Sequence, residues 1–230
     1  MEPIIRSHKG LFESHGTSAR LVWLDDNPPT CTMTYLEIDP GKTSPHHIHE
    51  WEHEVYIIEG TGTLVCDGKE YPVKAGDAIY VPPNIDHYTL NSGGPGVLRR
   101  IEVNPLIAAQ SGGAQNDGGE GTGEVPVISN LADLDLVPGP AQHVIAGPQG
   151  AQNYIMAHRC LGGNDNSPMH GHEWEHMGFI LSGSCLLIVD GKEYTVTEGD
   201  AVLVPPHADH EWRAIGDNKA AWLVFNPTTD

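Results

Sequence analysis

Hydrophobic residues in this chain occur in short runs that are separated by turn-forming residues. In the first half, β-prone runs lie at residues 55–58, 64–66, 71–73 and 78–81. Asp67-Gly68, between two of these runs, is a two-residue signal for a β-hairpin, and Pro82-Pro83 ends the last run. No segment of helical period separates the runs, so the pattern predicts an all-β sandwich or barrel.

The same pattern occurs twice. Residues 44–91 and 167–214 align without a gap at a constant offset of 123 residues, and they share the blocks HEWEH, DGKEY, GDA and VPP. Residues 107–124 between the copies include a Gly-rich polar stretch without periodicity, which predicts a flexible linker or, alternatively, a mobile lid over a site. We therefore predict one domain at residues 1–106 and a second at residues 125–230.

Charge and composition exclude several functions. The 12 basic and 31 acidic side chains give a formal net charge of −19, which disfavours binding to nucleic acid or to an anionic membrane surface. The chain shows no secretory signal and no apolar run near the ~20 residues that span a bilayer. Four cysteines without a C-x-x-C spacing are typical of reduced thiols, so we expect a cytoplasmic protein. P-loop, Rossmann and nucleophile-elbow motifs are absent from the sequence.

Histidine is the residue type that carries candidate chemistry, since 14 histidines exceed the combined Lys and Arg. Eight of them form two sets at identical spacing: His47, His49, His53 and His87, then His170, His172, His176 and His210. Alternate residues of a strand face the same side, so the first members of each set should point together. The last member follows after two or three further strands and could return to the same interior. Four converging imidazoles predict a site for a transition-metal ion in each copy.

These segments resemble the paired motifs of the cupin superfamily. The first motif, G-x5-H-x-H-x3,4-E-x6-G, aligns with Gly41, His47, His49, His53 and Gly60. The second, G-x5-P-x-G-x2-H-x3-N, aligns with Gly76, Pro82, Asn84, His87 and Asn91. The resemblance covers both copies and implies a bicupin, with two tandem double-stranded β-helix (jelly-roll) barrels.

The chain departs from the family pattern at the usual glutamate ligand. His53 and His176 stand at its place, Glu54 follows one residue later, and Met177 occupies the position that matches Glu54. Ligation by four histidines is the interpretation that fits both copies. The resemblance then implies two metal ions, one in each barrel, with Mn or Fe favoured and with Ni, Cu or Zn as alternatives. Asn84 and His207 replace the motif glycine, which concerns turn geometry only.

Residues around the histidines offer candidate catalytic groups. Arg100 and Glu102 share parity in the last run of the first copy, so they form either an inward polar pair or an ion pair on the outer face. The matching run of the second copy has Trp222 and Val224. Trp51 is interpreted as packing at the barrel rim or as a lid. The glutamates of HEWEH, including Glu52, are interpreted as acceptors for ligand imidazoles or as solvated rim carboxylates.

The predicted function is that of a metal-dependent enzyme. The leading hypothesis is a dioxygenase-like oxidoreductase that acts on a small enolisable or unsaturated molecule, with O₂ as a second substrate. Alternatives are a non-oxidative isomerase, lyase or aminohydrolase, and a non-catalytic small-molecule-binding protein. Expected partners are therefore small molecules, with no nucleic acid and no membrane, and the chain is expected to be a pseudo-dimeric monomer or to form a homodimer.

Overall fold

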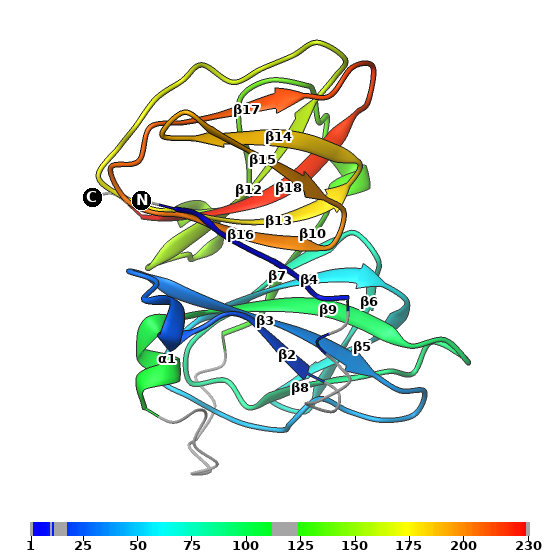
Figure 1. Cartoon of the computed structure of the whole chain (residues 1–230). Coiled ribbons are helices and arrows are strands. Elements are labelled where there is room, and N and C mark those ends of the chain that lie inside the picture. Colours follow the sequence, from blue (N-terminus) through cyan, green and yellow to red (C-terminus); the bar gives the residue numbers. More distant parts are fainter. Residues whose placement is uncertain (1, 10, 12–17, 112–123, 229–230) are drawn as a thin grey trace.

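The computed structural model describes residues 2–9, 11, 18–111 and 124–228, and it confirms an all-β fold of two tandem barrels (Figure 1). The first half contains β1 (Ile4–Ser7), β2 (Ser18–Val22), η1 (Leu24–Asp26), β3 (Cys31–Ile38), β4 (His53–Glu59), β5 (Thr61–Cys66), β6 (Lys69–Lys74), β7 (Asp77–Val81), β8 (His87–Leu90), β9 (Leu98–Pro105) and α1 (Leu106–Gln110). The second half contains β10 (Val127–Asn130), η2 (Leu131–Asp133), β11 (Gln142–Ile145), η3 (Gly147–Gln149), β12 (Tyr154–Leu161), β13 (His176–Ser182), β14 (Ser184–Val189), β15 (Lys192–Thr197), β16 (Asp200–Val204), β17 (His210–Ala214) and β18 (Ala220–Pro227).

The predicted linker at residues 107–124 is only partly described. Its first residues belong to the short helix α1, and residues 112–123 lie outside the described residues. No helix among the described residues is long and apolar enough to cross a membrane.

Each barrel combines a six-stranded sheet with a three-stranded sheet. The strand order is β10-β7-β4-β9-β3-β2 with β6-β5-β8 in the first barrel, and β1-β16-β13-β18-β12-β11 with β15-β14-β17 in the second. The predicted hairpin turn is present at Asp67-Gly68, where both residues have positive φ (47° and 73°), as a type I′ turn requires. Asp190-Gly191 repeats it with φ of 48° and 78°.

The two halves exchange one strand. β1 lies near the start of the chain but pairs with β16 of the second barrel, and β10 pairs in the same register with β7 of the first barrel. Figure 1 shows β1, in dark blue, running along the sheet of the upper barrel. Each six-stranded sheet is therefore completed by the other half of the chain. The domain boundaries at residues 106 and 125 stay a prediction. The β1–β16 and β10–β7 pairs join strands from opposite sides of these boundaries.

The largest hydrophobic core lies between the barrels. It joins side chains of both six-stranded sheets, including Met33 and Val103 from the first and Met156 and Phe225 from the second. Two smaller cores fill the barrels themselves. Tyr154, fully buried, also donates a hydrogen bond across the junction to the carbonyl oxygen of Val103 at 2.6 Å. Shared strands and a shared core bind the barrels into one folding unit.

Phe225→Ala should therefore destabilise both barrels together. The loss of this fully buried ring is expected to lower the free energy of unfolding by about 3–5 kcal/mol. Calorimetry should show one transition that shifts as a whole, whereas Val137→Ala, at an exposed position, should change stability by no more than about 0.5 kcal/mol. Two resolved transitions, with only one of them shifted by Phe225→Ala, would contradict the shared core.

Candidate functional site

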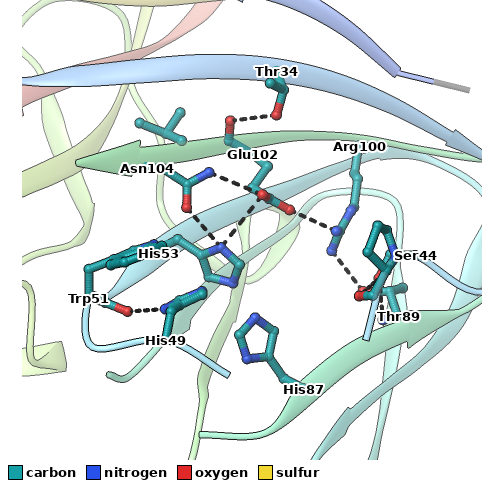
Figure 2. Close-up of polar contacts among 12 residues, drawn as sticks. Thr34, Ser44, His49, Trp51, His53, His87, Thr89, Arg100, Glu102 and Asn104 are labelled. Carbon is teal, nitrogen blue, oxygen red and sulfur yellow. Dashed lines mark hydrogen bonds and ion pairs between the residues drawn. The ribbon is translucent and has the colours of Figure 1, made fainter. Parts of the chain in front are cut away.

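Four histidines of the first barrel meet at one point although they come from separate elements. His47 forms an isolated bridge with His87 at the start of β8, His53 begins β4, and His49 lies in the segment between. One ring nitrogen of each histidine lies within 4.8 Å of the corresponding nitrogens of the other three. In Figure 2 the rings of His49, His53 and His87 face one another. The structure thus brings together the four residues that the spacing predicted.

Hydrogen bonds fix the tautomers of this first cluster. His49 and His87 bond through Nδ1 to backbone carbonyl oxygens at 2.6 and 2.7 Å, and His53 bonds through Nδ1 to Oδ1 of Asn104 at 3.2 Å. Because a carbonyl oxygen only accepts, each Nδ1 carries the proton and each Nε2 keeps its lone pair. The Nε2 atoms of these three histidines are buried without a hydrogen-bond partner. Such a set of orphaned lone pairs fits a transition-metal ion.

The second barrel repeats the arrangement. His170, His172 and His210 bond through Nδ1 to backbone carbonyls at 2.8, 2.6 and 2.9 Å, and His176 bonds to Oδ1 of Asn226 at 2.5 Å. The Nε2 atoms of His172 and His176 are 2.8 Å apart. This cluster is less enclosed than the first, because His170 is exposed and two of its partners are only half-buried.

Burial lowers the pKa of several cluster histidines in both barrels. It lowers the pKa of His47 to about 4 and that of His49 to about 3. In the second cluster burial lowers the pKa of His176 to about 3 and that of His210 to about 4. At pH 7 these lone pairs are therefore available to a cation without the release of protons.

Arg100 and Glu102 form the inward polar pair, one of the two alternatives that their parity left open. Glu102 accepts from Arg100 Nη2 at 2.7 Å and from Asn104 Nδ2 at 3.0 Å, and Arg100 Nη1 donates to the buried Thr89 hydroxyl at 2.8 Å (Figure 2). Burial alone would raise the pKa of Glu102, but the charge of Arg100 and the hydrogen bond from Asn104 hold it well below its ordinary value. Glu102 is therefore an ionised carboxylate, 3.7 Å from the His53 ring.

The corresponding positions in the second barrel are apolar. Trp222, Val224 and Trp212 take the places of Arg100, Glu102 and Thr89, and the two indole rings stack with centroids 4.7 Å apart. Only Asn226, the counterpart of Asn104, is retained. The two histidine sets are thus alike, while the groups beside them differ in polarity.

The cavities beside the two histidine clusters also differ, in volume and in lining. A cavity of about 320 Å³ opens beside the first cluster and is lined by Trp23, Thr32, Thr34, Pro45, His46, His47, His49, Trp51, Glu102, Asn104, Ala108 and Ala109. A cavity beside the second cluster measures about 30 Å³, with Trp212 and Val224 in its wall. The first has the volume for a small organic molecule, and the second has room for about one water.

Glu52 lies elsewhere than the sequence suggested, and Glu54 lies outside the histidine cluster, as ligation by four histidines requires. Glu52 neither reaches a ligand imidazole nor faces solvent: its carboxylate accepts the backbone N–H groups of Gln152 and Asn153 at 2.9 and 2.7 Å and the Tyr80 hydroxyl at 3.1 Å. Glu54 is fully buried toward the core between the barrels, and both of its carboxylate oxygens lack a partner. Burial raises its pKa well above the ordinary value. It is not part of the His47 cluster.

Sequence reasoning missed the two asparagines. Asn104 and Asn226 each hold the Nδ1 of a histidine, and each is followed by proline. The recurring Asn-Pro dipeptide was a signal that could have found them. Trp51 stacks flat on His49, with centroids 4.6 Å apart and 4° between the planes, and also lines the cavity.

Metal-free protein should lose stability as the pH falls from about 6.5 toward about 4. Six cluster histidines have a lowered pKa in the folded chain, so they take up protons on unfolding within this window. Each histidine contributes up to about 1.4 kcal/mol per pH unit to the slope of the unfolding free energy. Glu54 has a raised pKa in the folded chain, so it acts in the opposite direction, but it is one group against six.

Urea unfolding of chelator-treated protein between pH 7.5 and 5 measures this slope. His49→Gln should reduce it, whereas His143→Gln, at an exposed site outside both clusters, should not. A stability that stays flat across this range would show that the clusters are not held neutral.

Two curated relatives match short parts of the chain. An uncharacterized protein of Methanocaldococcus jannaschii is 40% identical over 53 residues, which is 23% of this chain and 42% of the relative. An oxalate-binding protein of Thermotoga maritima is 36% identical over 59 residues, which is 25% of this chain and 49% of the relative. The matches thus span less than half the length of either relative.

Solved structures match almost the whole chain at low identity. Salicylate 1,2-dioxygenase from Pseudaminobacter salicylatoxidans has a TM-score of 0.77 at 13% identity, covering 98% of this chain and 84% of that one. Oxalate decarboxylase from Bacillus subtilis, in a mutant form, has a TM-score of 0.72 at 16% identity, covering 97% and 76%. At this level of identity the likeness concerns the fold.

The family is shown by the sequence itself. A family model described as "Cupin domain" matches residues 34–102 and again residues 158–226, together more than half of the chain. Each match contains one complete four-histidine set. The chain belongs to the cupin family and is a bicupin, with one cupin domain in each half.

Proposed function

We propose that this bicupin is a metal-dependent oxidoreductase of dioxygenase type whose reaction takes place in the first barrel. One observation carries the proposal: a cavity of about 320 Å³, with an ionised Glu102 in its wall, meets the four-histidine cluster. His47, His49, His53 and His87 would hold one transition-metal ion, and the second set would hold another. Mn or Fe suits a centre with open coordination positions, while Ni, Cu and Zn remain alternatives.

A bound ion would supply Lewis acidity and, for Mn or Fe, a route for electrons to O₂. The residues of the chain supply positioning and proton transfer. Glu102 lines the cavity and is placed to accept a proton from a substrate hydroxyl or acidic C–H. Arg100 does not line the cavity, so its role is to hold Glu102 ionised and oriented through the bond at 2.7 Å. Asn104 connects Glu102 to the His53 ring.

The second centre is proposed to stabilise its barrel rather than to turn over substrate. The stacked Trp212 and Trp222 rings fill the place of the polar pair, and Val224 supplies no proton acceptor. A cavity of about 30 Å³ leaves no room for an organic substrate. The solved neighbours include both a dioxygenase and a decarboxylase, so the fold does not choose between reactions.

A non-oxidative isomerase or lyase is the second candidate, and Glu102 is the observation that favours it. A carboxylate that accepts and returns one proton is sufficient for such a reaction without O₂. An oxygen electrode separates the two candidates, because only the oxidoreductase consumes O₂ in step with substrate.

Metal analysis tests the two centres separately. The purified chain should contain about two transition-metal ions, and His53→Ala and His176→Ala should each remove about one. His143→Ala, outside both clusters, should leave the content unchanged. A native chain with less than about one ion, unaffected by either cluster variant, would refute the metal sites.

Glu102→Gln should separate chemistry from metal binding. Loss of the proton acceptor is expected to lower kcat by about 10²–10⁴-fold with metal content unchanged. Val224→Thr, at the matching position of the second barrel, should preserve kcat. Equal activity of Glu102→Gln and the native protein would remove Glu102 from the reaction.

A further inference from the structure

A chain of hydrogen bonds leads from the second histidine cluster toward the first, although the clusters lie in different barrels. It begins at His176, whose Nδ1 bonds to Oδ1 of Asn226 at the end of β18. Two residues further on, Thr228 donates its backbone N–H to the carbonyl oxygen of Asn153 at 3.0 Å and its hydroxyl to that of Gln152 at 2.6 Å. The residue between Asn226 and Thr228 is a proline with a fixed φ, so the two form a stiff unit.

Glu52 continues this chain of bonds to the first cluster. The backbone N–H groups of Gln152 and Asn153 donate to its carboxylate, and so does the Asn153 side-chain amide at 3.0 Å. Glu52 is 1% exposed, so solvent does not compete for these bonds. Its neighbours in the sequence are Trp51, which stacks on a cluster histidine, and His53, which belongs to the cluster. Bonds and one stiff segment thus connect a histidine of one cluster with the segment that carries the other.

The matching path from the first cluster is interrupted. Asn104 holds a histidine of that cluster, and two residues later Leu106 donates its N–H to the carbonyl oxygen of Thr30 at 2.8 Å, as in the second half. The next step is missing among the residues described: Pro29 has no N–H to donate, and one carboxylate oxygen of Glu175, the counterpart of the anchored glutamate, is buried without a partner. The duplicated chain therefore supplies its own matched control.

We propose that the two metal centres are coupled through this path, so that an ion bound at either histidine set raises the affinity of the other set. Hydrogen-bond networks and stiff segments of this kind can carry coupling between distant sites. An ion in the second set orders His176 and the end of β18, so part of the ordering cost at the first set is already met. Glu52 is the positioning residue at which the path enters the first set. The inference rests on the proposed metal centres and adds a link between their occupancies.

Titrations of chelator-treated protein with Co²⁺ at pH 7, followed by calorimetry, measure the coupling. The double variant His172→Ala, His210→Ala removes two ligands of the second set and keeps the His176–Asn226 bond, so it gives the affinity of the first set alone. The double variant His47→Ala, His87→Ala gives that of the second set alone. The coupling factor is the overall association constant of the unmodified chain for two ions, divided by the product of these two constants. It should be at least about five.

Glu52→Gln should bring the coupling factor close to one, because half of the acceptor becomes a donor that opposes the backbone N–H groups. Glu175→Gln is the matched control in the second half and should leave the factor unchanged. Thr228→Val removes the hydroxyl bond to Gln152 outside both histidine sets. It should lower the factor while each set alone keeps its affinity, which a general loss of stability would not do.

The outcomes separate failure of the coupling from failure of the proposed function. A chain that binds no Co²⁺ at either set refutes the metal centres themselves. Two bound ions with a coupling factor of one overturn the inference and leave both centres standing. A factor that survives both Glu52→Gln and Thr228→Val overturns the role of this path. If Glu52→Gln does not fold, as circular dichroism would show, Thr228→Val decides.

Discussion

The rest of the site depends on hydrogen bonds that fix the rings of seven of the eight cluster histidines through Nδ1. Five of these bonds go to a carbonyl only two residues away in the chain, so the backbone itself selects the tautomer. Asn84 and His207 adopt the left-handed conformation, with φ of 59° and 62°. Each lies in the turn that leads into the last histidine of its set, three residues later. The local chain thus turns the Nε2 lone pairs of these rings toward one another, and a metal ion would offset the cost of burying them.

The two barrels differ because of the strand that follows this shared frame. β9 and β18 occupy the same place in their sheets and both present an asparagine to a histidine. The barrels differ at the positions two and four residues before that asparagine. Arg100 and Glu102 in β9 form a charged pair, whereas Trp222 and Val224 in β18 are apolar. Since the histidine sets are alike, the barrels differ at these positions and in the size of the cavity beside each set.

Local and repeated features could be predicted from the sequence. The hairpin turns, the all-β class and the grouping of eight histidines follow from spacing alone, although the segment from His47 to His53 is mostly irregular and not the continuous strand that parity assumed. The strand exchange could not be predicted, because Ile4–Ser7 pairs with a strand almost 200 residues away and four residues carry too little pattern to name a partner. The position of Glu52 could not be predicted either, because it depends on a contact with Gln152, 100 residues away in the chain.

That distant contact shows how the second half of the chain supports the first histidine cluster. Glu52 lies between Trp51, which stacks on His49, and His53, and its carboxylate is held by backbone N–H groups of the second half. At the positions that match Gln152 and Asn153 the first half has Pro29 and Thr30, and a proline has no N–H to donate. Glu175, the counterpart of Glu52, accordingly has one buried oxygen without a partner. The second half of the chain therefore holds the segment that carries the first histidine cluster through Glu52, and the first half, in the part that the structure describes, makes no equivalent contact to Glu175.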